Sequence, residues 1–318
     1  FHETWDIVYP ESAHGFARTG QTIVPVPDGT VIRLLADDDP VTCVDTEVRS
    51  FERVLDMQHA VLRRMVVFQL GDGCRLMVET TRFVSLAQRH LAGIRYRITA
   101  LDTARHLVLS SELVTPRPPG DEQVLDPRQS REFGDDVLQP EVERVEGTRV
   151  VRTYRTARSR LAVAAGMDHE VGPGLVHAGT RIEDARAHAV FELDARPGRS
   201  VTLTKWLGYH WGAGDSADLA DRTELTLVRA RRAGWDATRA YHEREVADFW
   251  DRSDVQLEGA PAGQEAVHFS LFTLMQASLR SEGHGVPAKG LTGTGYEGHY
   301  FWDTEMYVLP FLIHTSPD

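Results

Sequence analysis

The sequence has little cysteine and no long apolar run, and both shortages limit the class of protein. Only Cys43 and Cys74 are present among 318 residues, and they form no C-x-x-C pair. Both fall in stretches with strand character, so we expect two buried thiols rather than a disulfide. Low cysteine use and the lack of an apolar run of about 18 residues predict a cytoplasmic protein with no membrane partner.

Positive charge is also scarce relative to negative charge. The chain has 35 Lys and Arg against 47 Asp and Glu, which gives a formal net charge of -12. Such a surface repels phosphate backbones, so we expect no nucleic-acid partner. Low-complexity tracts are absent too, and 42% hydrophobic residues suffice for a sizeable core of about two domains.

The two ends of the sequence lack the usual marks of a complete protein. The first residues, FHETWDIVYP, contain neither Met nor a signal peptide. The last residues, FLIHTSPD, follow directly on an apolar segment. We therefore expect a part of a longer protein.

Residues 20 to about 210 have the pattern of many short strands. Pro27-Asp28-Gly29 is a turn signal between two β-rich runs, and Gly71-Asp72-Gly73 predicts a hairpin. The segment Thr115 to Glu143 is rich in Pro, Asp and Glu and predicts a long loop or insertion. Short strands with frequent turns favour an antiparallel β-sandwich. The predicted strands are Gln21–Val26, Thr30–Ala36, Leu62–Leu70, Cys74–Thr80, Ile94–Ile98, Thr148–Arg155, Leu161–Ala165, His188–Leu193 and Ser200–Trp206.

The pattern becomes helical after residue 212. Asp215 and Ser216 are candidate caps of a helix that runs to about Arg232. Two further helices are predicted at Trp235–Asp251 and Gln264–Arg280. The last of these is apolar on more than one face, which is typical of a helix buried between neighbours in a larger helical domain.

The segment Gly283 to Phe311 contains the candidate site. It begins as a Gly-rich loop and ends as an aromatic, apolar stretch, with Trp302 and Asp303 at the junction. An indole face can pack on the C–H face of a sugar, and a carboxylate can accept hydrogen bonds from its hydroxyls. A structural alternative is core packing for Trp302 and a helix cap for Asp303, with Glu305 as an ordinary first-turn acid.

One motif in this segment is a chance match. Residues 293–298 fit G-x-G-x-x-G, the fingerprint of dinucleotide-binding folds. That fingerprint requires a strand immediately before it, whereas further glycines precede it here. We expect no nucleotide or other cofactor.

This segment contains Pro287-Ala288-Lys289-Gly290-Leu291, then Gly298-His299, then Phe301-Trp302-Asp303-Thr304-Glu305. These residues resemble the signature that opens the catalytic domain of the family 65 glycoside hydrolases and phosphorylases. The similarity covers essentially the whole chain in a consistent order. The matching residues upstream of this segment are Phe1-His2-Glu3, Tyr9-Pro10-Glu11-Ser12, Gln21-Thr22, Pro27-Asp28-Gly29, Asp56-Met57, Leu62-Arg63-Arg64, Arg82-Phe83-Val84-Ser85 and Asp126-Pro127-Arg128.

The resemblance implies a mainly β fold followed by helices. Residues 1–212 would form an antiparallel β-sandwich that is incomplete at its start. Residues 213–258 would form a helical linker, and residues 259–318 the beginning of a truncated (α/α)6 catalytic barrel.

The resemblance also implies an activity on α-glucosidic disaccharides such as maltose, trehalose or kojibiose. Most members use inorganic phosphate as co-substrate, invert the anomeric centre and release β-glucose 1-phosphate. One carboxylic acid is then sufficient, because phosphate arrives as an anion and needs no base. The family's acid Glu lies downstream of the signature, so we expect no catalytic residue in these 318 residues and an inactive fragment.

Trp302 would wall the glucose subsite and Asp303 would bind its hydroxyls, whereas His299 and Glu305 match the motif as structural residues. Asp303 and Glu305 are two residues apart on a helix, about 200° around its axis, which suits two acids on one substrate poorly. The disaccharide is not specified by these residues, and a homodimer is compatible with the family.

A second hypothesis is a non-catalytic carbohydrate-binding or dimerisation module. Its candidate sugar-binding aromatics are Trp5, Trp206, Trp211 and Trp235, although core packing is favoured for each of them.

Overall fold

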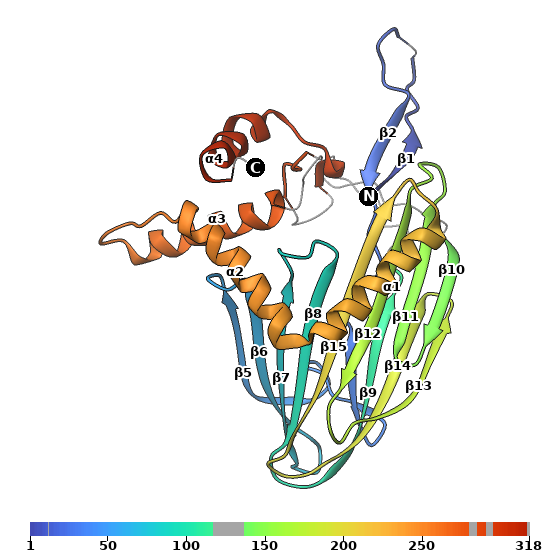
Figure 1. Cartoon of the computed structure of the whole chain (residues 1–318), viewed down its shortest axis with the longest axis vertical. Coiled ribbons are helices and arrows are strands. Elements are labelled where there is room, and N and C mark those ends of the chain that lie inside the picture. The colour runs from blue at the N-terminus through green and yellow to red at the C-terminus, as the bar shows by residue number, and fades with distance from the viewer. Residues whose placement is uncertain (12, 117–136, 280–284, 291–294, 317–318) are drawn as a thin grey trace.

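The computed structural model describes residues 1–11, 13–116, 137–279, 285–290 and 295–316. Two antiparallel sheets face each other and are followed by helices (Figure 1), so the predicted order of a β-sandwich and then helices is confirmed.

The larger sheet has eight strands and forms one layer of the sandwich. Its order is β10-β11-β12-β15-β8-β7-β6-β5, so β10 and β5 are its edges. In chain order, its strands are β5 (Glu47–Asp56), β6 (Val61–Gln69), β7 (Arg75–Val84), β8 (Leu91–Ala100), β10 (Leu138–Glu146), β11 (Arg149–Thr156), β12 (Ala162–Val171) and β15 (Ser200–Gly212).

The second layer has five strands in the order β13-β14-β9-β3-β4. They are β3 (Ile32–Ala36), β4 (Asp39–Pro40), β9 (Arg105–Val114), β13 (Val176–Glu183) and β14 (Arg186–Ala195). A separate hairpin of β1 (His2–Asp6) and β2 (Thr19–Ile23) extends beyond the end of the sandwich (Figure 1).

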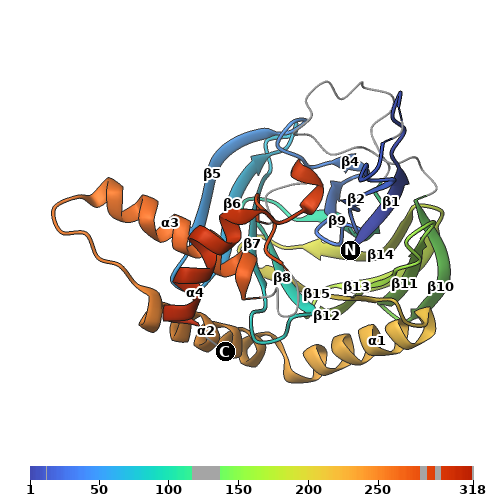
Figure 2. The ribbon, with the colours of Figure 1, turned by 90° about the horizontal axis from the view of Figure 1, so that it is seen from above.

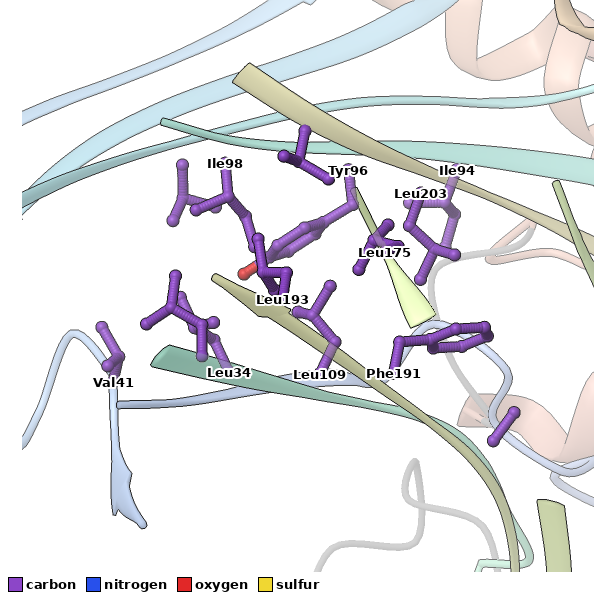
Figure 3. Close-up of a cluster of buried hydrophobic side chains, with 14 of the residues drawn as sticks. Leu34, Val41, Ile94, Tyr96, Ile98, Leu109, Leu175, Phe191, Leu193 and Leu203 are labelled. Carbon is purple, nitrogen blue, oxygen red and sulfur yellow. The ribbon is translucent and has the colours of Figure 1, made fainter. Parts of the chain in front are cut away.

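The main core lies between the two layers because alternate residues of facing strands point inward. Ile94, Tyr96 and Ile98 of β8 meet Leu109 of β9 and Leu193 of β14 in one buried cluster (Figure 3). A period of two along each strand produces this arrangement.

Two helices cover the outer face of the eight-stranded sheet, α1 (Ser216–Ala233) and α2 (Trp235–Ser253) (Figure 2). The predicted cap of α1 is confirmed, since Asp215 accepts a hydrogen bond from the N–H of Ala217 at 3.2 Å. Trp206 and Trp235 form a second buried cluster beneath these helices, so α1 and α2 are fixed to the sandwich.

The remaining helical elements bury much less of their surface. They are α3 (Pro261–Ser278), the 3-10 turn η1 (Gly295–Gly298), the π-helical turn η2 (Thr304–Val308) and α4 (Leu309–Thr315). Only Met275, Ala277 and Ser278 of α3 are buried, and η2 and α4 have no buried residue. No helix in the described ranges is long and apolar enough to cross a bilayer.

Several local predictions were wrong. Cys43 is exposed in a turn, and only Cys74 is buried, immediately before β7. Residues 27–29, predicted as a turn between two strands, connect β2 and β3 of different sheets, and Asp28 forms an isolated bridge with Val114 instead. The predicted loop Thr115–Glu143 includes the start of β10, and its residues 117–136 lie outside the described part.

Candidate functional site

Trp302 and Asp303 lie at the start of the helical segment that continues into η2 and α4. The predicted loop-to-helix junction is therefore in the expected place. Trp302 is 80% exposed, and Asp303 is exposed beside it. Asp303 has helical dihedral angles and its side chain makes no capping hydrogen bond, so the alternative role as a helix cap is wrong.

The backbone around this pair is cross-linked by hydrogen bonds. The Thr304 hydroxyl donates to the Val286 carbonyl at 3.0 Å, and the Ala288 N–H donates to the His299 carbonyl at 3.3 Å. The Thr304 N–H donates to the Phe301 carbonyl at 3.0 Å. These contacts tie the segment 285–290 to the turn that presents Trp302 and Asp303.

The turn also rests on the N-terminal hairpin. Gly298 has a φ of +77°, and a Cβ at this position would overlap Cγ2 of Ile23 in β2. A glycine is needed here both for the positive φ and for the close approach. The Tyr296 and Phe301 rings pack edge to face in the same turn, with their centroids 5.6 Å apart.

His299 and Glu305 occupy different environments near the pair. The His299 Nε2 lies 3.7 Å from a Glu297 carboxylate oxygen, and the ring is half-buried. Burial is the main cause that lowers the pKa of His2, and the nearby His299 lowers it further. Glu305 is exposed on η2. Their structural roles stay predictions.

The adjacent indole and carboxylate are chemically suited to a hydroxyl-rich ligand. Both side chains are exposed, and a sugar offers C–H bonds to the ring and hydroxyl donors to the oxygens. No group of three or more potential metal ligands is present in the described ranges. The exposed indole and carboxylate are therefore candidates for one wall of a sugar-binding surface.

The other tryptophans are distributed between core and surface. Trp206 and Trp235 are buried in the cluster beneath α1 and α2, as expected from core packing. Trp5 is half-buried against Gly20 in the N-terminal hairpin. Trp211 near the end of β15 is 42% exposed.

A cavity of about 620 Å³ lies at the other end of the sandwich and was not predicted. It is lined by the β3–β4 and β6–β7 turns and by Arg105. Arg105 forms ion pairs with Asp37 and Asp72 there. The arginine is thus neutralised by the cavity's own carboxylates.

Family models and relatives agree on the class of the chain. Residues 1–249 match the glycosyl hydrolase family 65 N-terminal domain, and residues 268–318 match the family 65 central catalytic domain. An uncharacterized glycosyl hydrolase of Mycobacterium tuberculosis is 40% identical over the whole chain, which covers 40% of that protein. The α,α-trehalose phosphorylase of Thermoanaerobacter brockii is 31% identical, again over the whole chain and 41% of the relative.

The kojibiose phosphorylase of Escherichia coli is 28% identical over 84% of the chain and 34% of its own length. The chain therefore spans about two fifths of the curated relatives that it matches. A solved structure described as a putative kojibiose phosphorylase from the human microbiome shares the fold. Its TM-score is 0.85 at 17% identity, over 99% of this chain and 40% of the other. The chain belongs to glycoside hydrolase family 65.

Proposed function

We propose that the chain is the N-terminal part of an inverting phosphorylase that acts on an α-glucosidic disaccharide and releases β-glucose 1-phosphate. Trehalose and kojibiose phosphorylases among its relatives support this reaction class. The observation that carries the proposal is the exposed pair Trp302 and Asp303, held at a helix start within the matched catalytic segment.

In this proposal Trp302 stacks on the non-reducing glucose and Asp303 accepts hydrogen bonds from its hydroxyls. Both contacts hold the sugar while phosphate attacks the anomeric carbon from the opposite side. The departing oxygen needs a proton from a general acid, and phosphate needs no base. The acid and the phosphate ligands belong to the part of the protein that lies outside these 318 residues, so the chain alone is inactive.

Ligand-observed NMR with trehalose, kojibiose and maltose tests the binding step, since one wall of a pocket binds weakly. We expect Trp302→Ala and Asp303→Asn each to weaken disaccharide binding about tenfold, the effect of one stacking or charged contact. Matched controls are Tyr307→Ala and Glu305→Gln, which remove an exposed ring and an exposed acid from the next residues of the same helical segment.

Two results would contradict the proposal. Disaccharide binding that survives both site variants would instead support a sugar-binding or dimerisation module. Glucose 1-phosphate released by the 318-residue chain from any of the three disaccharides would place the acid within it, at Asp303 or Glu305.

A further inference from the structure

Three arginines gather on one face of the eight-stranded sheet, far from each other in the sequence. Arg53 of β5 is directly opposite Arg64 of β6 in the strand register. Arg82 of β7 is opposite Leu62, two residues along β6 on the same face as Arg64. We call Arg53, Arg64 and Arg82 the arginine cluster.

The cluster belongs to the inner face of the sheet, which faces the second layer. Val66 follows Arg64 by two residues, is opposite Val78 of β7, and is buried with it in the main core. Side chains two residues apart on a strand share a face, so Arg64 points to the same side as Val66. Arg82 follows Val78 by four residues and shares that face as well.

The cluster lacks the carboxylates that neutralise neighbouring arginines. On the opposite face of the same sheet, Arg63 pairs with Asp56 and Arg97 of β8 pairs with Glu79. Within the described ranges no ion pair joins a carboxylate to any member of the cluster, and the Arg64 Nε is buried without a hydrogen-bond partner. Like charges directly opposite in a sheet are destabilising, so the arrangement carries a cost that a bound anion would remove.

The charges around Arg82 also indicate that the arginine cluster is not neutralised. Burial lowers the pKa of Arg82, and the charges of Arg53 and Arg64 lower it further, while Asp28 opposes them. Asp28 supplies a single negative charge against the three guanidinium groups, and its Oδ1 also accepts hydrogen bonds from the N–H and hydroxyl of Thr30 at 2.7 Å. The cluster therefore keeps a local excess of positive charge in a chain whose formal net charge is -12.

The cluster is accessible from the edge of the sandwich. β5 is the free edge strand of the eight-stranded sheet (Figure 2), and all its residues except Asp56 are exposed. Phe51 precedes Arg53 by two residues on the same face and is 54% exposed. An anion can thus approach the guanidinium groups beside an aromatic ring.

The guanidinium chemistry selects the type of anion. Each guanidinium presents a planar fork of N–H donors that matches two oxygens of a phosphate group. Three neighbouring guanidinium groups suit a small oxyanion with several oxygens. The strongly negative chain disfavours a polyanion such as a nucleic acid.

We propose that the arginine cluster is a binding site for a phosphate group, carried by inorganic phosphate or by a small sugar phosphate. The site is formed by the sandwich and does not involve Trp302 or Asp303. It is therefore independent of the function proposed above, and neither proposal fails with the other.

Calorimetric titration of the chain in phosphate-free buffer tests the site, with inorganic phosphate and glucose 1-phosphate as probes at constant ionic strength. We expect saturable binding of one phosphate per chain and a higher Tm in phosphate than in chloride. Arg64→Gln and Arg82→Gln should each raise the Kd about tenfold. Arg63→Gln, which removes the neighbouring charge on the opposite face, should leave the Kd unchanged.

The variants should fold, because each removes a like-charge repulsion, and their Tm in chloride should equal or exceed that of the wild type. Tighter binding of glucose 1-phosphate that is lost in Phe51→Ala would support a sugar phosphate, and equal binding of both probes would support inorganic phosphate. The proposal is overturned when phosphate raises Tm no more than chloride, or when Arg63→Gln weakens binding as much as Arg64→Gln.

Discussion

At the scale of single residues, His169 is a fully buried imidazole that should make the fold sensitive to acid. Its nitrogens lie 2.8 Å from the Ser111 hydroxyl and 3.1 Å from the Thr148 carbonyl. Burial lowers the pKa of His169 to about 3, from an ordinary value of 6.5. The pKa of His169 is lower in the folded state than in the unfolded state, so the unfolded state binds a proton first as the pH falls. The contribution of neutral His169 to stability is therefore complete above pH 6.5 and is lost as the pH falls toward 3.

We predict that this residue alone costs about 2 kcal/mol of unfolding free energy between pH 6.0 and 4.5. Urea unfolding at both pH values should show that this part of the loss is missing in His169→Gln. The buried Lys205 does not interfere, since burial lowers its pKa to about 7 and it is charged throughout this range in both states. His106→Gln is the control, because the pKa of exposed His106 is raised by Asp194 and its removal cannot reduce the acid loss. The prediction would be refuted if the wild type and His169→Gln lost the same unfolding free energy between pH 6.0 and 4.5.

The residues of the two proposed sites differ in how far the sequence could predict them. Trp302 and Asp303 are adjacent, so a local motif was sufficient to select them. Arg53, Arg64 and Arg82 meet only through the register of three strands, which no short motif encodes. The failure at Cys43 has a similar origin, because strand-like residues there form a turn between β4 and β5.

At the scale of elements, the contact of η1 with β2 depends on Gly298. A Cβ on this residue would meet both a positive φ and the Ile23 side chain. We predict that Gly298→Ala lowers the opening free energy of residues 295–308 by about 2–4 kcal/mol, or releases this segment fully. Native-state hydrogen exchange of peptides from this segment measures the effect.

Gly198 provides a matched control, because its φ is +71° and no atom lies within 4 Å of a Cβ built there. Gly198→Ala should cost only the backbone part, about 1 kcal/mol. Adding Ile23→Ala to Gly298→Ala should restore the part of the opening free energy that is lost through the overlap of the new Cβ with the Ile23 side chain. Equal costs for the two single glycine variants would show that η1 does not rest on β2.

Elements with strong local signals were predictable, and elements defined by distant contacts were not. The hairpin of β6 and β7 follows from its Gly71-Asp72-Gly73 turn, and α1 begins at its predicted cap. β5 was missed because both of its faces are exposed and a bulge interrupts its alternation near Val48. The start of β10 was hidden in an acidic, Pro-containing segment, where pairing with β11 overrides the local composition.

At the scale of the whole molecule, the described helices fall into two groups, α1 and α2, which bury many residues, and α3, η2 and α4, which bury few or none. α1 and α2 cover the sheet and share a cluster that contains Trp206, Trp235 and Leu227. From α3 onward burial is sparse, and exposed apolar side chains include Phe269, Trp302 and Tyr307. The match to the N-terminal family model ends at residue 249 and the match to the catalytic-domain model begins at residue 268, close to this change in packing.

Because local stability follows buried contacts, we predict two levels of hydrogen-exchange protection in this chain. Amides of β8, β15 and α1 should open only with global unfolding, so their exchange should follow the denaturant dependence of the whole fold. Amides of α3 and α4 should exchange at least about 100-fold faster, which corresponds to roughly 3 kcal/mol less protection. Mass spectrometry of peptides from both groups, with α2 as the boundary element, tests this difference. Equal protection of α3 and α1 would mean that α3 is stabilised by contacts other than those of Met275, Ala277 and Ser278, and the division at α2 would then be wrong.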